Sequence, residues 1–531
     1  MGKRIYPRPV TQEPASYTSI QGELVAKTEK AGPILGLAPK LKSAVKAPEK
    51  AETYLIPVLK GTDGLELPST NLVGGKQLRE VFDTLSALGA TGKSGEVTRV
   101  PAPAKSPAHV IVAVGLGDPE EISAETVRRA AGSAARALSG AGHVATTLGD
   151  FGLTAAVEGI MLGGYVHRGN KTDKLKSQDK PANFTFLIGS TDEDKAAFNT
   201  GVINAEGTIL ARDLVNTPAN FLYPESYANF IAKHAKGTDV KVDILDEKEL
   251  EKQGFGGIMS VGKASQRPPR LVRLTYKSGK KAKNVALVGK GITFDTGGIS
   301  LKPGAGMWDM ISDMGGSAAV AGATFAAAKL GLDVNITTYL PLAENMPDGG
   351  ATRPGDVVTH YGGITSEVLN TDAEGRMVLG DAMALASEAK PDYLIETATL
   401  TGAQLVALGK RTAGVMGSED FRDRVAKLGR EVGENAWAMP LLEEHEESIK
   451  SPVADIRNID GNREGGMEYA GTYLSKFVGE GIEWVHIDVA GPAWNGGSPY
   501  GYNVKRATGA PVRTILATLA DIAAESGKER K

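Results

Sequence analysis

The second half of the chain repeats one pattern that narrows the possible folds: apolar, strand-like runs end in clusters of Gly, Asp, Lys, Thr or Glu. The runs are NVALVGKGITFD, NITTYLPLA, SEVLNTD, DYLIETATLTG and WVHIDVAGP. Helix-like segments separate them, and this alternation is typical of α/β proteins. Open α/β sheets bind ligands at the carboxyl ends of their strands. We therefore expect the functional site along that edge of a sheet.

The length of 531 residues exceeds what one hydrophobic core usually contains, so two domains are expected. Residues 1–50 are rich in Pro, Lys, Ala and Ser, which predicts a partly ordered leader. A smaller N-terminal α/β domain is predicted for 51–190 and a linker helix for 191–215. The remaining residues, 216–531, are expected to form a larger C-terminal α/β domain.

The composition excludes several classes of function. The chain has no cysteine, so disulfides, thiolate nucleophiles and Cys-based zinc sites are impossible. A net charge of −3, from 60 Lys and Arg against 63 Asp and Glu, gives no support to a nucleic-acid partner. No apolar run reaches the roughly 18 residues that a membrane span requires. The N-terminus lacks the apolar segment of a secretory signal, so a cytoplasmic location is predicted.

One short stretch, VLNTDAEGRMVLGDA at 368–382, places two acids and an arginine between a strand-like and a helix-like run. In an extended segment Asp372 and Glu374 would point the same way, so both carboxylates could bind one cation. Arg376 begins the next helix and could hold a planar anion with its fork of donors. The alternative is an Asp helix cap with a surface ion pair.

A second stretch, VGKGITFDTGGISLKPG at 288–304, contains Lys290, Asp295 and Lys302 in a glycine-rich loop. A surface salt bridge would also explain these charges, but the flanking residues are apolar and lysine is rarely buried. A third stretch places Asp313 before a small-residue helix, where Asp is commonly an N-cap. Asp309 is its weaker competitor for a ligand role.

Elimination favours carboxylate and lysine chemistry. The seven histidines are scattered without metal-binding spacing, and no serine nucleophile motif occurs. His486 is expected to be a core residue. Four acids that share one cleft repel each other unless cations neutralise them. Two divalent ions about 3.5–4 Å apart would do so.

Together, VGKGITFDTGGISLKP, SDMGG, NTDAEGRMVLGDA and ETATLTGA resemble the M17 family of leucyl (cytosol) aminopeptidases of bacterial type, over about residues 210–520. The resemblance implies an α/β fold with a smaller N-terminal domain and a catalytic α/β/α domain on a mixed, mostly parallel sheet. It further implies a homohexamer that acts on peptide substrates. Two divalent ions per subunit, Mn²⁺ or Zn²⁺, are expected as cofactors.

The family pattern assigns roles to seven residues of this sequence. The implied metal ligands are Lys290, Asp295, Asp313, Asp372 and Glu374. Lys302 is implied as the electrophile and Arg376 as the anchor of a bicarbonate that shuttles protons. Lys290 can be a ligand only when neutral, which requires its pKa to fall from about 10.4. The attacking group would be a hydroxide that bridges the two ions.

Family analogy also predicts a first side-chain pocket suited to Leu, Met or similar residues. Its expected lining is Met310, Thr399, Leu400, Gly402 and Ala490. Two alternatives stay open: a two-metal phosphoesterase, which gives no reason for Lys290 as a ligand, and an additional DNA-binding role, which the near-neutral charge does not favour.

Overall fold

The computed structural model describes residues 31–172, 180–279 and 281–528. The predicted leader falls largely on residues 1–30, which lie outside the described residues. Leu41–Ala44 of the same segment form strand β1, which pairs in parallel with β7 (Asn183–Leu187). Within the described residues, no helix combines the length and the apolar character needed to cross a membrane.

The N-terminal domain is built on a mainly parallel sheet in the order β1-β7-β6-β2-β5-β4. Its central strands are continuous apolar runs, as expected for strands covered on both faces. The remaining strands are β2 (Thr53–Gly61), β3 (Gly64–Glu66), β4 (Val97–Pro101), β5 (Val110–Gly115) and β6 (His143–Thr146). One face packs on α3 (Ala124–Ala137) and α4 (Leu153–Gly163). The other packs on α2 (Gly75–Ala87).

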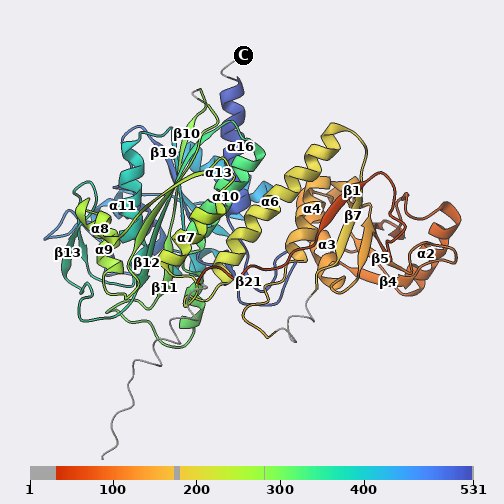
Figure 1. Cartoon of the computed structure of the whole chain (residues 1–531), viewed down its shortest axis with the longest axis horizontal. Coiled ribbons are helices and arrows are strands. Elements are labelled where there is room, and N and C mark those ends of the chain that lie inside the picture. The colour runs from red at the N-terminus through yellow and green to blue at the C-terminus, as the bar shows by residue number, and fades with distance from the viewer. Residues whose placement is uncertain (1–30, 173–179, 280, 529–531) are drawn as a thin grey trace, which may run out of the picture.

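Helix α6 (Asp192–Asn216) belongs to both domains (Figure 1). Its first half contributes Phe198 to the N-terminal core, and its second half contributes Leu214 to the C-terminal core. Fully buried Arg212 donates hydrogen bonds to Leu162 O at 2.7 Å and to Thr508 O at 2.8 Å. These bonds tie the two domains together through the helix.

The C-terminal domain contains a nine-stranded mixed sheet in the order β17-β16-β19-β15-β10-β12-β9-β8, with β11 paired to β12. Its strands are β8 (Lys241–Leu245), β9 (Arg270–Tyr276), β10 (Asn284–Gly289), β11 (Gly291–Asp295), β12 (Asn335–Asn345), β15 (Tyr393–Ala398), β16 (Ala413–Gly417), β17 (Ala436–Ala438) and β19 (Glu483–Asp488). The contiguous strands β19, β15, β10 and β12 are parallel. The predicted α/β fold on a mixed, mostly parallel sheet is thus confirmed.

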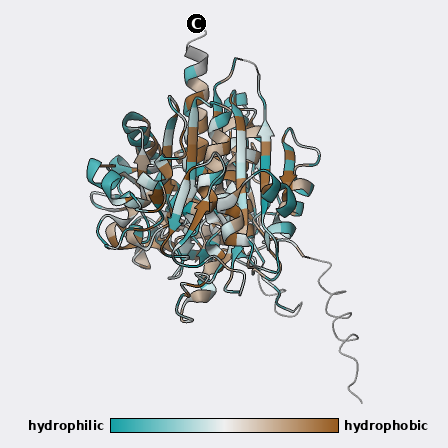
Figure 2. Ribbon diagram, turned by 90° about the vertical axis from the view of Figure 1, so that its left-hand side faces the viewer, coloured by the Kyte–Doolittle hydropathy of each residue, from teal (hydrophilic) through white to brown (hydrophobic). Residues whose placement is uncertain are grey.

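Helices cover both faces of this sheet, and the apolar strands lie between them (Figure 2). One layer consists of α6, α7 (Pro224–His234), α10 (Gly315–Leu330), α13 (Glu419–Glu431) and α16 (Val512–Lys528). The other contains α8 (Glu247–Lys252), α9 (Gly256–Gly262), α11 (Gly375–Glu388) and α15 (Gly466–Ser475). Shorter helices are η1 (Pro119–Glu121), η2 (Leu148–Phe151), η3 (Met307–Ser312), α12 (Gly402–Leu408) and α14 (Glu443–Ser448).

One predicted strand lies outside the main sheet. SEVLNTD yields β14 (Thr365–Val368), which pairs with β13 (Asp356–Thr359) and β18 (Ile456–Arg457) in a separate three-stranded sheet. A two-stranded sheet joins β20 (Trp494–Asn495) to β21 (Arg506–Ala507). Asp372 and Glu374 therefore reach the edge of the main sheet from a side element.

Candidate metal centre

Lys290 follows β10 and is buried, with 3% of its surface exposed. Its Nζ lies 2.8 Å from Glu374 Oε1 and 2.9 Å from Asp313 Oδ2, and it donates a hydrogen bond to Thr399 O at 3.1 Å. The alternative of a surface salt bridge is therefore wrong. These contacts join the ends of β10 and β15 to the start of α11.

Asp295 is the last residue of β11, and its carboxylate is fully engaged. Its Oδ1 accepts hydrogen bonds from Gly297 N at 2.8 Å and Asn345 Nδ2 at 2.7 Å, while Oδ2 lies 2.8 Å from Lys302 Nζ. Lys302 also pairs with Asp372. Gly297 has φ +87°, and a Cβ there would lie 2.8 Å from Asp372 Oδ1. Only glycine lets this loop approach Asp372 so closely.

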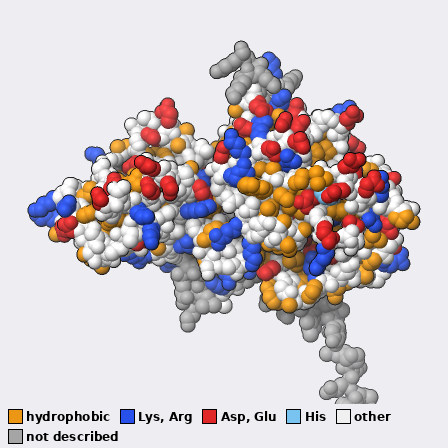
Figure 3. Space-filling model, turned by 180° about the vertical axis from the view of Figure 1, so that it is seen from behind, with side chains coloured by type: hydrophobic (Ala, Val, Ile, Leu, Met, Phe, Trp, Pro, Cys, Tyr) orange, Lys and Arg blue, Asp and Glu red, His pale blue; other side chains and the backbone are white. Residues whose placement is uncertain are grey.

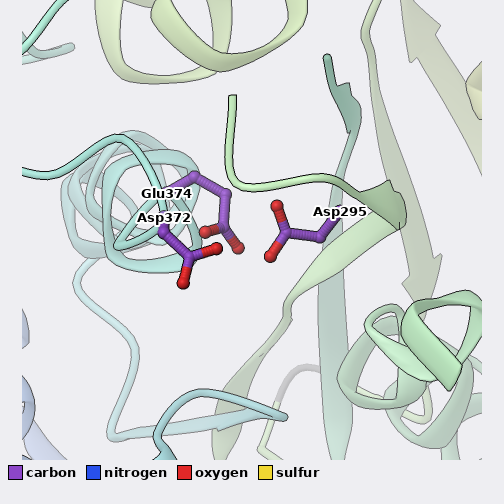
Figure 4. A group of neighbouring side chains, drawn as sticks. All are labelled: Asp295, Asp372 and Glu374. Carbon is purple, nitrogen blue, oxygen red and sulfur yellow. The ribbon is translucent and has the colours of Figure 1, made fainter. Parts of the chain in front are cut away.

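Asp372 and Glu374 lie in a turn rather than in the extended segment that the sequence suggested. The turn forms because Asn370 Oδ1 accepts a hydrogen bond from Asp372 N at 2.8 Å. Glu374 occupies the cap position of α11 but makes no capping hydrogen bond with its side chain. Carboxylate oxygens of Asp295, Asp372 and Glu374 all lie within 4.8 Å of one another, and the three side chains point together (Figure 4).

Asp313 joins the cluster instead of capping α10. The cap residue of that helix is Met314, with no side-chain capping bond. Asp313 Oδ1 accepts a hydrogen bond from Thr399 Oγ1 at 2.9 Å, and Oδ2 faces Lys290. Six residues predicted as metal ligands or electrophile thus meet in one place, although they come from three separate segments.

The charges of this cluster do not balance: four carboxylates face the two ammonium groups of Lys290 and Lys302. Burial, and then Asp295, raise the pKa of Glu374 to about 8. Burial likewise raises the pKa of Asp313 to about 6, against the pull of Lys290. The surrounding protein groups therefore do not fully stabilise the ionised form of these two buried acids, and nearby positive charge would lower their pKa.

The protein groups around Lys290 raise its pKa. A neutral lysine that binds metal would require a lowered pKa instead. Burial lowers this pKa, but the carboxylates of Asp313, Glu374 and Asp295 together raise it. Divalent cations beside the amine would act in the opposite sense, because like charges disfavour the ammonium form. Three buried oxygen atoms make no hydrogen bond of good geometry within the described part of the chain: Asp313 Oδ2, Asp372 Oδ1 and Glu374 Oε1. Oxygen atoms of this kind fit hard divalent ions.

Arg376 lies beside the acids on the first turn of α11 and is buried. Its Nη1 donates a hydrogen bond to Asn458 O at 2.5 Å, and its guanidinium lies 5.7 Å from the Tyr469 ring and 5.9 Å from the Tyr473 ring. Its Nε has no hydrogen-bond partner among the residues that the structure describes. A fixed, buried guanidinium with a free donor is suited to holding a small anion.

Models of two protein domains match the chain. Residues 209–516 match "Cytosol aminopeptidase family, catalytic domain", and residues 77–174 match "Cytosol aminopeptidase family, N-terminal domain". The "Probable cytosol aminopeptidase" of Corynebacterium diphtheriae is 59% identical over 495 residues, which cover 92% of this chain and 98% of that protein. The protein of the same name from Rhodococcus erythropolis is 51% identical over 494 residues, with the same coverage.

The chain belongs to the cytosol aminopeptidase family. Among solved structures it is similar to "Bottromycin maturation enzyme BotP", with a TM-score of 0.79 and 35% identity over 89% of this chain and 100% of that one. A structure of the same enzyme in complex with Mn gives a TM-score of 0.79 at 34% identity. Membership of the family supports the assignment of this protein as an aminopeptidase, and aminopeptidases are hydrolases.

Of the predicted pocket residues, Thr399 and Met310 contact Asp313, while Leu400 and Ala490 share a hydrogen-bond partner in Asp488. Leu400 N and Ala490 N donate hydrogen bonds of 3.2 Å and 3.1 Å to one oxygen of buried Asp488. Thr399 contacts Asp313, and Asp313 N donates a hydrogen bond to Met310 O at 3.2 Å. Gly402 begins α12, two residues beyond Leu400. Their role in substrate binding stays a prediction.

Sequence reasoning missed three buried residues whose side chains hold the loops around the cluster in place. Asn345 ends β12 and Asp488 ends β19, so the pattern of polar residues at strand ends could have identified both. Asn458 follows the two-residue strand β18 and carried no such signal. His486 is buried as expected and pairs with Glu396 inside the sheet.

Proposed function

We propose that this protein is a dimetal exopeptidase that removes the N-terminal residue, preferably Leu, Met or a similar apolar residue, from peptides. The observation that carries the proposal is the convergence of Asp295, Asp372 and Glu374 within 4.8 Å, beside Lys290 and Asp313. Two divalent ions, Mn²⁺ or Zn²⁺, held by these five residues would supply Lewis acidity and lower the pKa of a water molecule.

The side chains around the ligands divide the remaining work. Lys302 is partly exposed, and nearby carboxylates raise its pKa against the effect of burial, so it stays protonated. An ammonium group here stabilises the negative charge that develops on the oxygen of the scissile carbonyl. Arg376, with its free Nε, would hold a bicarbonate that accepts and returns a proton, because no histidine among the described residues contacts the acid cluster.

The proposed ions also suggest why the site would act at chain ends. Two dications beside Asp295, Asp313, Asp372 and Glu374 would favour the uncharged form of an amine and could bind its lone pair. The N-terminal residue of a peptide offers a free α-amino group of this kind, and an internal peptide bond does not. Met310, Thr399, Leu400, Gly402 and Ala490 would line the pocket for the first side chain.

We further propose that the protein is a cytoplasmic homohexamer and that it has no membrane or nucleic-acid partner. The name of the relatives, "Probable cytosol aminopeptidase", supports the location. On the face seen in Figure 3, basic and acidic side chains are interspersed, which does not favour binding to a polyanion.

The test combines metal analysis with two substrates. Elemental analysis should find two divalent ions per subunit, and chelation should abolish leucine release from a leucyl amide until Mn²⁺ or Zn²⁺ is restored. Glu374→Ala should lose this activity while its circular dichroism spectrum stays unchanged. Full activity in that variant would refute the assignment. Hydrolysis of a phosphate ester in place of the amide would support a two-metal phosphoesterase instead.

A further inference from the structure

Asn458 is a fully buried residue that contacts two parts of the site. These are the loop that carries Asp372 and Glu374 and the side chain of Arg376. Asn458 follows β18, which pairs in parallel with β14 so that Arg457 lies opposite Glu367. Asn458 N extends this pairing with a hydrogen bond to Glu367 O at 2.9 Å. The register therefore places Asn458 beside the loop that leaves β14 and carries Asp372 and Glu374.

The side chain of Asn458 directs its hydrogen bonds to that loop. Its Oδ1 accepts from Leu369 N at 2.8 Å and from Asn370 N at 3.3 Å. Its Nδ2 donates to Asn370 O at 2.7 Å and to Ala373 O at 3.5 Å. An amide side chain offers two donors and an acceptor oxygen with two lone pairs, so its capacity is used here.

The backbone of the same residue holds the arginine. Asn458 O accepts the 2.5 Å hydrogen bond from Arg376 Nη1. One residue therefore fixes the loop on one side and the guanidinium on the other. Because Asn458 is buried, losing its side chain would leave the backbone groups of the loop without their present partners, at a cost in free energy.

We propose that Asn458 is a positioning residue that keeps the loop of Asp372 and Glu374 and the side chain of Arg376 in one fixed arrangement. The inference rests on the proposed dimetal function, since it assigns Asn458 a role toward metal ligands that it does not itself join. Partners behind metal ligands typically contribute about 10–100-fold to metal affinity or activity. We expect an effect of this size.

The chain provides a matched control in Asn335, at the opposite end of β12 from Asn345. Asn335 is also buried, and its side chain makes four comparable bonds to the backbone: it accepts from Ser278 N and Gly279 N and donates to Gly279 O and Ala282 O. A fifth bond goes to Asn284 Oδ1. A strand of 11 residues separates it from Asn345 by roughly 30 Å. Asn335→Ala should thus lower stability without reaching the metal centre.

The experiment compares Asn458→Ala and Asn335→Ala in the full-length protein. Calorimetric titration of Mn²⁺ into chelator-treated protein should show about 10–100-fold weaker binding for Asn458→Ala only. Its kcat on a leucyl amide should fall with little change in KM. Amide hydrogen exchange of segment 369–373 in metal-free protein should speed up in Asn458→Ala and not in Asn335→Ala.

Each outcome bears on one claim. Equal Mn²⁺ affinity and kcat in the two variants would overturn the positioning role, as would unchanged exchange of segment 369–373. Wild-type protein that neither binds Mn²⁺ nor releases leucine would instead overturn the proposed function, and the exchange data would still test the role of Asn458. If Asn458→Ala does not fold, Asn458→Asp keeps the acceptor oxygen but loses the Nδ2 donors, and the same Mn²⁺ and exchange changes are expected of it.

Discussion

Replacing Gly375 with alanine should separate activity from stability. Gly375 is the first residue of α11, and a Cβ added there would lie 2.7 Å from Lys290 Cδ and Cε and 2.8 Å from Lys290 Nζ. Ordinary carbon contacts are about 3.5–4.0 Å, so the lysine has to retreat by roughly 0.8 Å or more. Its contacts with Glu374 at 2.8 Å and Asp313 at 2.9 Å would then exceed hydrogen-bonding distance.

The two expected effects of Gly375→Ala have opposite signs. Displacement of a group by about 1 Å at a catalytic centre can cost about 100-fold in rate, and we expect a loss of about 10–100-fold in kcat/KM and in Mn²⁺ affinity. Alanine is up to about 1 kcal/mol more favourable than glycine inside a helix. The thermal midpoint of the metal-free variant should therefore not fall in proportion to the loss of activity.

The N-terminal domain supplies the control. Gly75 is likewise the first residue of a helix, α2, and a Cβ at that position meets nothing within 4 Å. Gly75→Ala should leave leucine release and calorimetric Mn²⁺ binding unchanged. If Gly375→Ala also retains wild-type affinity and activity, Lys290 does not need its present position and the argument from its contacts is refuted.

Three further predictions concern the same cluster. Burial raises the pKa of Glu374 from 4.5 to about 8, so folded metal-free protein binds more protons than unfolded protein between these pH values. The thermal midpoint of the metal-free protein should therefore fall as the pH rises from 5 to 8. A midpoint that rises over this range would contradict the raised pKa. Arg376→Lys cannot reproduce the fork of donors and should lose about tenfold or more in kcat, with bicarbonate dependence as the readout. Thr399→Val removes the hydroxyl that donates to Asp313 at 2.9 Å but keeps the carbonyl that faces Lys290, so Mn²⁺ titration should show weaker binding, and unchanged affinity would exclude a role for this bond.

The sequence could predict those features of the site that depend on short sequence patterns. Apolar runs that end in polar residues indicated that Lys290, Asp295 and Thr399 lie at strand ends of one sheet. Lys290 and Thr399 directly follow β10 and β15, and Asp295 is the last residue of β11. Parallel neighbours bring such strand ends to one edge whatever their separation in the chain. The fold class was predictable for the same reason.

Other features depend on contacts that no local pattern encodes. Strand β1 was predicted as part of a leader because its ordering depends on the edge of β7, more than 130 residues later. The conformation of Asp372 depends on an Asn370 side chain that favours a turn over an extended strand. Asn458 acquires its position from the pairing of β18 with β14, about 90 residues earlier, and its own segment shows no clear periodicity.

The charge of the site links its chemistry to the fold. Four carboxylates and two ammonium groups gather in surroundings that raise the pKa of Glu374 and Asp313, so the chain holds an excess of negative charge at a cost in stability. The groups come from segments up to 84 residues apart, between Lys290 and Glu374, and they meet only in the folded chain. A dication that binds this arrangement and not the unfolded chain stabilises the fold by mass action. The residues that would bind metal come together only when this edge of the sheet is folded. Metal affinity and the stability of the sheet edge should therefore change together.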